Sequence, residues 1–270
     1  HRRGQWRPDR NLLRRGLGIG VAVAVMTGVL VGVRIAIPGL PEALRGLRIG
    51  QITDAHIAPD LTPIAQLERG CELLAGERLD LMVSTGDLCD SPRLFPDVVR
   101  LISQVPARLG RFACLGNHEL YLDLRMVYRA YERSDTELLA ESLTRKGPLT
   151  IAGLSYPHAG SMRMSRARIP AMLNAALRER AAETVTLMLS HHPHVFAQAE
   201  GRGIGLMLSG HTHGGQLGIG ERSLMEPFYG YVRGRYQAQD GTQLFVGSGL
   251  GHWLPWRVNC PPEVVVIELV

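Results

Sequence analysis

The amino-acid sequence predicts an α/β fold: one globular domain preceded by an apolar N-terminal segment. From Leu47 onward short apolar runs alternate with helical stretches, and several of these runs end in polar side chains. A length of 270 residues allows one domain with a sizeable core. A content of 45% hydrophobic and 20% charged residues is ordinary for a folded protein.

The positive charge of the chain lies in its N-terminal tail. The formal net charge is +5, and residues 1–15 hold six arginines and one aspartate, which accounts for all of it. The remainder of the chain is therefore formally neutral. A nucleic-acid partner would favour a basic stripe on the domain itself, so nucleic acid is not expected as a partner.

An uncharged run between Arg15 and Arg34 predicts a membrane-spanning helix. Its eighteen residues would span roughly 27 Å as a helix, close to a hydrocarbon core of about 30 Å. Five glycines and many valines make a poor helix in water, and no polar face would meet solvent. The expected division of the chain is a basic tail (1–15), a transmembrane anchor (16–37), a linker containing proline and glycine (38–46) and a globular domain (47–270).

The arginines before the apolar run predict the orientation of the anchor. Positive residues stay on the cytoplasmic side, so the globular domain is expected across the membrane. The alternative is an export signal, because Arg14 and Arg15 precede an apolar run loosely as in twin-arginine signals. No clear A-x-A cleavage site precedes the domain, and an uncleaved anchor is the preferred interpretation.

The apolar periodicity predicts the elements of the domain in order. Strands are expected over 47–54, 79–87, 111–118, 184–193 and 204–213. Helices are expected over 62–77 and 96–109, and further β-structure over 231–251 and 261–270. Thr62 is a candidate N-cap, and Asp240-Gly241 is the turn signal of a hairpin.

Five of the predicted strands end in polar side chains that suit a metal site. One such strand end is commonly a turn, but five in one chain indicate a shared site, because ligands gather outside the carboxyl ends of strands. His211 and His213 leave a strand on the same face, and the glycines around them let the backbone approach a small target. The residues concerned are Asp54, His56, Asp87, Asn117, His118, His191, His211 and His213.

This mixture of carboxylate, amide and imidazole donors suits two borderline divalent ions such as Mn²⁺, Fe or Zn²⁺. Asp87 is the natural bridge, because a carboxylate can hold two cations about 3.5–4 Å apart while offsetting their repulsion. Such a pair lowers the pKa of a water between the ions and clamps the oxygens of an in-line displacement. The expected chemistry needs no serine or cysteine nucleophile.

The ordered motif set resembles the calcineurin-like metallophosphoesterases over about residues 45–270. The motifs are Asp54-x-His56, Gly86-Asp87, Gly116-Asn117-His118-Glu119, Ser190-His191-x-Pro193 and Gly210-His211-Thr212-His213. The resemblance implies a four-layer αββα sandwich of two mixed sheets between helices. It implies one metal held by Asp54, His56, Asp87 and His213, and a second held by Asp87, Asn117, His191 and His211. His118 would lie near the scissile phosphate, stabilising charge or protonating the leaving oxygen.

The C-terminal motifs are similar to those of a bacterial subgroup with an N-terminal transmembrane or twin-arginine segment. They are SGHTHGGQ (209–216), GSGLG (247–251) and CPPEVVVIEL (260–269). With the arginine-rich tail, this resemblance leads us to expect a single-pass enzyme of the bacterial inner membrane with its domain on the periplasmic side. The resemblance also implies a phosphodiesterase or diphosphatase. Mn²⁺ is the metal expected first for this donor set, with Fe, Zn²⁺ or Mg²⁺ as other choices.

The expected substrate is a phosphodiester or diphosphate, either lipid-linked or a nucleotide, and no obligate protein partner is evident. The compact stretch between His118 and Thr184 leaves little room for a large substrate-capping insert, which argues against a bulky lipid–nucleotide. Two alternative functions stay open. A non-catalytic metal-binding scaffold predicts missing ligands, and none is missing, whereas a hydrolase of amide or ester bonds would share the metals.

Several residues outside the ligand set receive weaker interpretations. His192 and His194 are interpreted as structural residues or as supports behind the ligands. For His252, Trp253 and Trp256 both a place at the site mouth and a plain loop role stay open. Arg257 is not assigned to phosphate binding.

Overall fold

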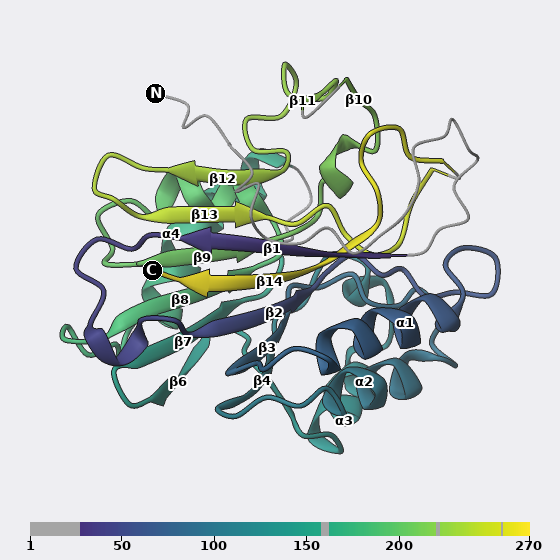
Figure 1. Cartoon of the computed structure of the whole chain (residues 1–270), viewed down its shortest axis with the longest axis horizontal. Helices are drawn as coiled ribbons and strands as arrows, with labels where there is room; N and C mark the ends of the chain where they lie inside the picture. The colour runs from purple at the N-terminus through teal and green to yellow at the C-terminus, as the bar shows by residue number, and fades with distance from the viewer. Residues whose placement is uncertain (1–27, 158–161, 220–221, 255) are drawn as a thin grey trace.

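Two six-stranded sheets pack face to face in the computed structural model, which describes residues 28–157, 162–219, 222–254 and 256–270 (Figure 1). The first sheet contains, in spatial order, β1 (Val29–Ile35), β14 (Glu263–Leu269), β2 (Arg48–Ile52), β3 (Leu81–Ser84), β4 (Gly110–Ala113) and β5 (Thr136–Leu138). The second contains β12 (Gly234–Gln237), β13 (Gln243–Val246), β9 (Leu206–Ser209), β8 (Val185–Ser190), β7 (Leu149–Leu154) and β6 (Ser142–Lys146). Both mix parallel and antiparallel pairs, so the predicted α/β fold with two mixed sheets is confirmed.

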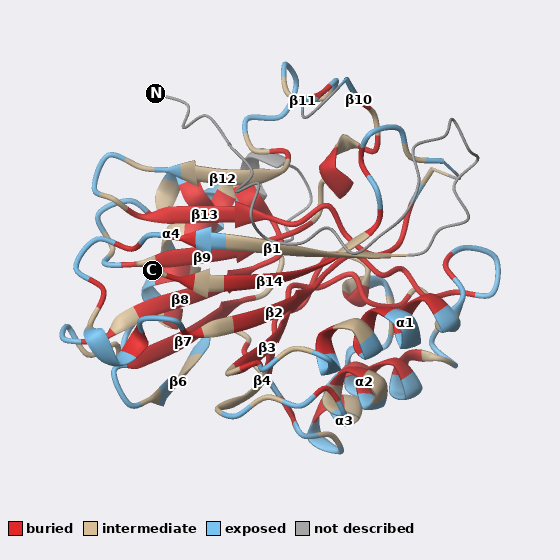
Figure 2. Ribbon diagram, viewed as in Figure 1, coloured by how far each residue is buried: buried red, intermediate tan, exposed pale blue. Residues whose placement is uncertain are grey.

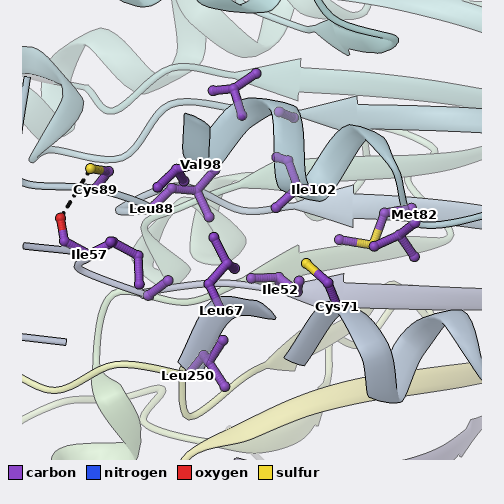
Figure 3. Packing of buried hydrophobic residues seen from close by; sticks show 14 of the residues in the cluster. Ile52, Ile57, Leu67, Cys71, Met82, Leu88, Cys89, Val98, Ile102 and Leu250 are labelled. Carbon is purple, nitrogen blue, oxygen red and sulfur yellow. Dashed lines mark hydrogen bonds between the residues drawn. The ribbon is translucent and has the colours of Figure 1, made fainter. Parts of the chain in front are cut away.

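Helices cover the outer face of each sheet. The first sheet carries α1 (Ile64–Ala75), α2 (Phe95–Ser103) and α3 (Leu124–Glu132), and the second carries α4 (Met162–Ala176) and the 3-10 helix η3 (Pro193–Gln198). Figure 3 shows Leu67 of α1 and Ile102 of α2 in one buried cluster with Ile52 of β2. The four layers follow from these two helix–sheet cores and the core between the sheets.

Alternation along the strands assigns each side chain to a layer. Leu81 and Val83 of β3 lie between the sheets, whereas Met82 lies beneath the helices. In β9, Leu208 faces the core between the sheets and Met207 faces the layer that contains α4. Strands buried on both faces are mainly apolar, and Figure 2 shows the centres of both sheets buried.

Most of the predicted elements are present but shorter than expected. The predicted helix over 62–77 is α1, and its N-cap position is held by Pro63 with no side-chain cap, so the expectation for Thr62 is wrong. The predicted hairpin is formed by β12 and β13, and Asp240 Oδ1 accepts a hydrogen bond from the Thr242 N–H in its turn. β5 to β7, α3 and α4 were not predicted from the sequence, because they are short or, in α4, interrupted by Pro170.

The segment predicted as a membrane helix over 16–37 contains a strand in its C-terminal part. β1 pairs in parallel with β14 over seven residues, from Val29↔Glu263 to Ile35↔Leu269. Hydropathy alone cannot separate an apolar strand from an apolar helix, and the β-branched residues of VLVGVRI favour a strand. The remainder of the predicted anchor, 16–27, lies outside the described residues.

The predicted linker 38–46 also belongs to the folded structure. It contains the 3-10 helix η1 (Glu42–Leu44), and Leu40 and Leu44 pack into the core between the sheets. Across the ranges that the structure describes, no helix combines the length and the apolar character needed to cross a membrane.

Removing β1 tests whether this segment is part of the domain. A chain that begins at Ala36 should lose about 3 kcal/mol or more of unfolding free energy, because β14 becomes an edge strand and buried Ile35 is lost. A chain that begins at Gly28 keeps β1 and is the matched control. Urea denaturation of both chains measures the difference, and equal midpoints would contradict a structural role for β1.

Candidate metal centre

The predicted polar residues lie together because their strands end at one edge of the sandwich. β2, β3 and β4 are parallel neighbours in the first sheet, and β8 and β9 are parallel neighbours in the second. Asp54 and His56 follow β2, Asp87 follows β3, Asn117 and His118 follow β4, His191 follows β8, and His211 and His213 follow β9.

One candidate ligand group consists of Asp54, His56 and His213, whose donor atoms all lie within 4.8 Å of one another. His56 Nε2 is 3.1 Å from His213 Nε2, and His213 Nε2 is 3.5 Å from Asp54 Oδ1. All three residues are buried. His56 Nε2 is also 3.7 Å from Asp87 Oδ2, which places Asp87 beside this group.

A second group consists of Asp87, His191 and His211. His191 Nε2 is 3.1 Å from Asp87 Oδ2 and 3.2 Å from His211 Nδ1. The buried Asn117 Oδ1 atom has no hydrogen-bond partner. A buried amide oxygen without a partner is costly, and a cation would satisfy it. The donor set therefore fits two metal ions that share Asp87.

The backbone at these ligands is strained. Left-handed φ angles occur at Asp54 (50°), His56 (46°), Asp87 (53°), His211 (72°) and His213 (50°). Each such residue costs of order 1–3 kcal/mol and persists only where the surroundings fix it, as at functional sites. Five strained residues that meet at one edge indicate that the backbone is held for a purpose other than stability.

Glu119 fixes the backbone between two of these loops. It is fully buried and accepts hydrogen bonds from the N–H groups of Asp87 (2.9 Å), Leu88 (2.7 Å) and Gly116 (2.8 Å). Gly116 passes so close that a Cβ there would lie 2.1 Å from Asp87 Oδ1, and only glycine fits. Glu119 stands in one of the motifs quoted above, but its role as an acceptor for backbone N–H groups appears only in the structure.

The buried carboxylates around the second group favour a bound cation. His191 Nδ1 lies 2.7 Å from the Thr85 carbonyl oxygen and donates to it, so in the neutral ring Nε2 presents a lone pair to Asp87. Burial opposes charge on His191, yet Asp87 and Asp54 raise its pKa to about 10. The Asp87 carboxyl is itself buried, but His191 and His56 hold its pKa well below the usual range. A divalent ion meets the same demand for positive charge.

Asp90 belongs to the candidate site, although it was not predicted from the sequence. Its Oδ2 atom is 2.9 Å from His56 Nδ1, and its Oδ1 atom is 2.7 Å from His118 Nδ1. One carboxylate thus orients a predicted metal ligand and the ring expected near the phosphate, whose side chain is 36% exposed. The available signal was its place three residues after Asp87 on the same strand end.

Arg257 and His192 support the ligands of the second sheet. The partly buried Arg257 guanidinium donates to the carbonyl oxygens of Ser248 and Gly251, and its Nη2 atom is 3.3 Å from His213 Nδ1. The His192 ring stacks on His211 with ring centroids 4.4 Å apart, and burial together with His211 lowers its pKa to about 2. His192 therefore lies directly behind a ligand.

His252, Trp253 and Trp256 belong to the loop between β13 and β14. His252 is buried, with Nδ1 3.4 Å from Thr62 Oγ1. Trp253 and Trp256 are 62% and 52% exposed, on a surface loop. Tyr156, which the sequence analysis did not consider, lies with its ring centroid 5.8 Å from that of His211.

The family model of the calcineurin-like phosphoesterases matches residues 47–215, more than half of the chain. This chain belongs to the calcineurin-like phosphoesterase family. The match begins at Leu47 and ends at Gly215, and it includes all eight predicted site residues. At the level of the family, the chain is therefore a metal-dependent phosphoester hydrolase. It contains candidate residues for two metals.

Curated relatives are between 25% and 29% identical to this chain over the residues that align. An uncharacterized metallophosphoesterase of Campylobacter jejuni is 29% identical, over 85% of this chain and 61% of its own length. A transmembrane protein with a metallophosphoesterase domain from Danio rerio is 28% identical, over 93% and 59%. The chain thus spans about six tenths of the length of these two relatives.

The phosphodiesterase YaeI of Escherichia coli K12 is 25% identical, over 81% of this chain and 80% of its own length. Among solved structures, a dimetal phosphatase from Danio rerio is 14% identical, with a TM-score of 0.45, over 78% of this chain and 90% of that one.

Replacing Arg257 should loosen the site around His213. In Arg257→Gln the carbonyls of Ser248 and Gly251 lose their donor, and we expect metal affinity to fall about 10–100-fold, as when other groups that orient a ligand are removed. The amount of metal that each variant retains after gel filtration, measured by mass spectrometry, tests the expected fall in affinity. Arg222→Gln on the exposed β11 (Arg222–Ser223) is the control, and equal retention in both variants would contradict the role of Arg257.

Proposed function

We propose that this chain is a phosphodiesterase that depends on two divalent metal ions. The observation that carries the proposal is the position of the Asp87 carboxylate, whose Oδ2 atom faces His191 of one ligand group at 3.1 Å and His56 of the other at 3.7 Å. Two cations that share a ligand need a negatively charged group between them. A carboxylate with imidazoles on both sides is such a group.

We assign one ion to Asp54, His56, Asp87 and His213, and the other to Asp87, Asn117, His191 and His211. When bound, the two ions would supply a nucleophilic water near neutral pH and neutralise charge on the phosphate. Mn²⁺ is the first choice for a mixed set of nitrogen and oxygen donors, with Fe, Zn²⁺ and Mg²⁺ as the others.

The protein's own residues then orient the phosphate and move the proton. The His118 side chain is 36% exposed, against 4% for His56 and 6% for His213. Asp90 accepts a hydrogen bond from its Nδ1 atom, so Nε2 is left to carry a proton toward a leaving oxygen. Its backbone N–H donates to Asp87 Oδ1 at 2.9 Å, which couples its position to the shared carboxylate. Asn117 offers its unpartnered oxygen beside it.

A diester or diphosphate substrate is favoured over a monoester. The relative named phosphodiesterase YaeI, which matches this chain over most of its length, supports this choice. The two alternatives predict different results: a scaffold binds metal without turnover, and an amide or ester hydrolase leaves phosphodiesters intact.

Hydrolysis of bis-p-nitrophenyl phosphate tests the function directly. The full chain, stripped of metal and then given Mn²⁺, should hydrolyse it, and Asp87→Asn should lose more than about a hundredfold of kcat, because the shared negative charge is gone. Glu132→Asn on the exposed face of α3 is the control. Two bound metals per chain with no turnover of any phosphodiester would favour the scaffold.

The pH profile tests the role of His118. The hydrogen bond that His118 Nδ1 donates to Asp90 Oδ1 is the largest contribution that raises the pKa of His118. A proton donor is active below its pKa, so kcat should fall as pH rises through that value. At saturating Mn²⁺, Asp90→Asn should move this alkaline limb to lower pH, whereas the exposed Asp123→Asn should not. An unmoved limb would remove His118 as the proton donor.

A further inference from the structure

Two loops at the edge of the metal centre expose large apolar side chains to solvent. Of the eleven large hydrophobic residues that are exposed among those the structure describes, seven lie between positions 217 and 258. Monomeric proteins rarely expose such side chains as a contiguous patch without a binding role. We name six of them the apolar rim: Ile219 (73% exposed), Leu224 (49%), Phe228 (79%), Trp253 (62%), Trp256 (52%) and Val258 (48%).

Hydrogen bonds join the two loops into one surface. The loop that contains β10 (Gly218–Ile219) meets the C-terminal loop where the Gly218 N–H donates to the Val258 carbonyl at 2.8 Å. The buried Gln216 accepts from the Trp253 N–H at 3.1 Å and donates to the Trp256 carbonyl at 3.1 Å. Because Gln216 follows His213 by three residues, the apolar rim is fixed relative to the metal centre. Figure 1 shows β10 and β11 beside the loop that leads into β14.

The N-terminal chain enters the domain at this same edge. Val29 pairs with Glu263, and Val265 pairs with Gln51, so the start of β1 is level with the residues just before Asp54. β1 is two strands away from β2, roughly 10 Å across the sheet. A Cβ on Gly28 would lie 2.7 Å from Leu250 Cδ1, in the loop that carries Trp253.

With β1 assigned to the sheet, the uncharged segment before it is short. Thirteen uncharged residues remain, 16–28, and as a helix they would extend about 20 Å, less than the ~30 Å of a hydrocarbon core. Tryptophan side chains are favoured at the interface between a bilayer and water, and the six arginines within residues 1–15 complement anionic headgroups.

We propose that the apolar rim docks on an anionic phospholipid bilayer, with the metal centre facing its surface. The docking is attachment to one leaflet and requires no membrane-spanning helix.

Vesicle binding of the full chain tests the proposal. The three tryptophans include Trp6 in the tail, so a Trp6→Phe background leaves only Trp253 and Trp256 as probes in the rim. On vesicles of phosphatidylcholine with one quarter phosphatidylglycerol, their emission should shift to the blue and be quenched by brominated lipid. In the same background, Leu224→Ser with Phe228→Ser should reduce co-sedimentation about tenfold or more, because partition falls with the inserted apolar area. Tyr128→Ser, which alters an exposed aromatic residue on α3, should leave binding unchanged.

Two results would overturn the proposal. Vesicle-bound protein with no blue shift and no quenching would show that the rim stays in water. A lipid-free oligomer that dissociates when Leu224 and Phe228 are replaced would make the rim an interface between copies of this chain. Turnover of the soluble diester needs no bilayer, so failure of docking and failure of the proposed hydrolysis are separate results.

Discussion

Keeping the Asp87 carboxylate ionised while it is buried is the constraint on which this structure depends. The residue is 2% exposed, and burying a carboxylate costs several kcal/mol unless charge and hydrogen bonds compensate. Compensation comes from both sheets: His191 follows a strand of the second sheet, and the His118 N–H follows a strand of the first. The compensation therefore requires the two sheets to pack face to face with their strand ends aligned.

The same constraint explains the strained backbone around the site. A left-handed backbone conformation at the strand end turns each side chain inward. This conformation costs free energy, and a flexible loop would relax out of it. Glu119 prevents the relaxation between two loops by binding three backbone N–H groups, and Asp54 does so on the second sheet by accepting from the His211 N–H at 2.9 Å. Rigid strands and these hydrogen bonds together hold the donor atoms in place before any ion arrives.

The residues that contact the candidate ligands from behind hold their side chains in one orientation. Asp90 fixes the rings of His56 and His118 on the side of the first sheet, and His192 and Arg257 support the ligands of the second. His118 is left partly exposed, so a phosphate is expected to approach from that opening. In our proposal the apolar rim at this edge turns the opening toward a lipid surface.

The sequence by itself determined the alternation of strands and helices and the residues that gather at the site. Asp54, Asp87 and His191 could be chosen because each follows an apolar strand, and parallel strands end at a common edge. This local information is also what identified the family. The pairing of ligands into two groups followed only from resemblance, because no local pattern states which strand ends meet.

Only the tertiary structure showed that β1 is a strand and that Asp90 and Arg257 lie at the candidate site. A buried strand and a membrane helix have the same hydropathy, and only pairing with β14, more than two hundred residues away, distinguishes them. Arg257 meets His213 across 44 residues of sequence, and Asp90 meets His118 across 28. Such contacts depend on where the packed layers bring distant loops, and that is a property of the whole sandwich that no local pattern encodes.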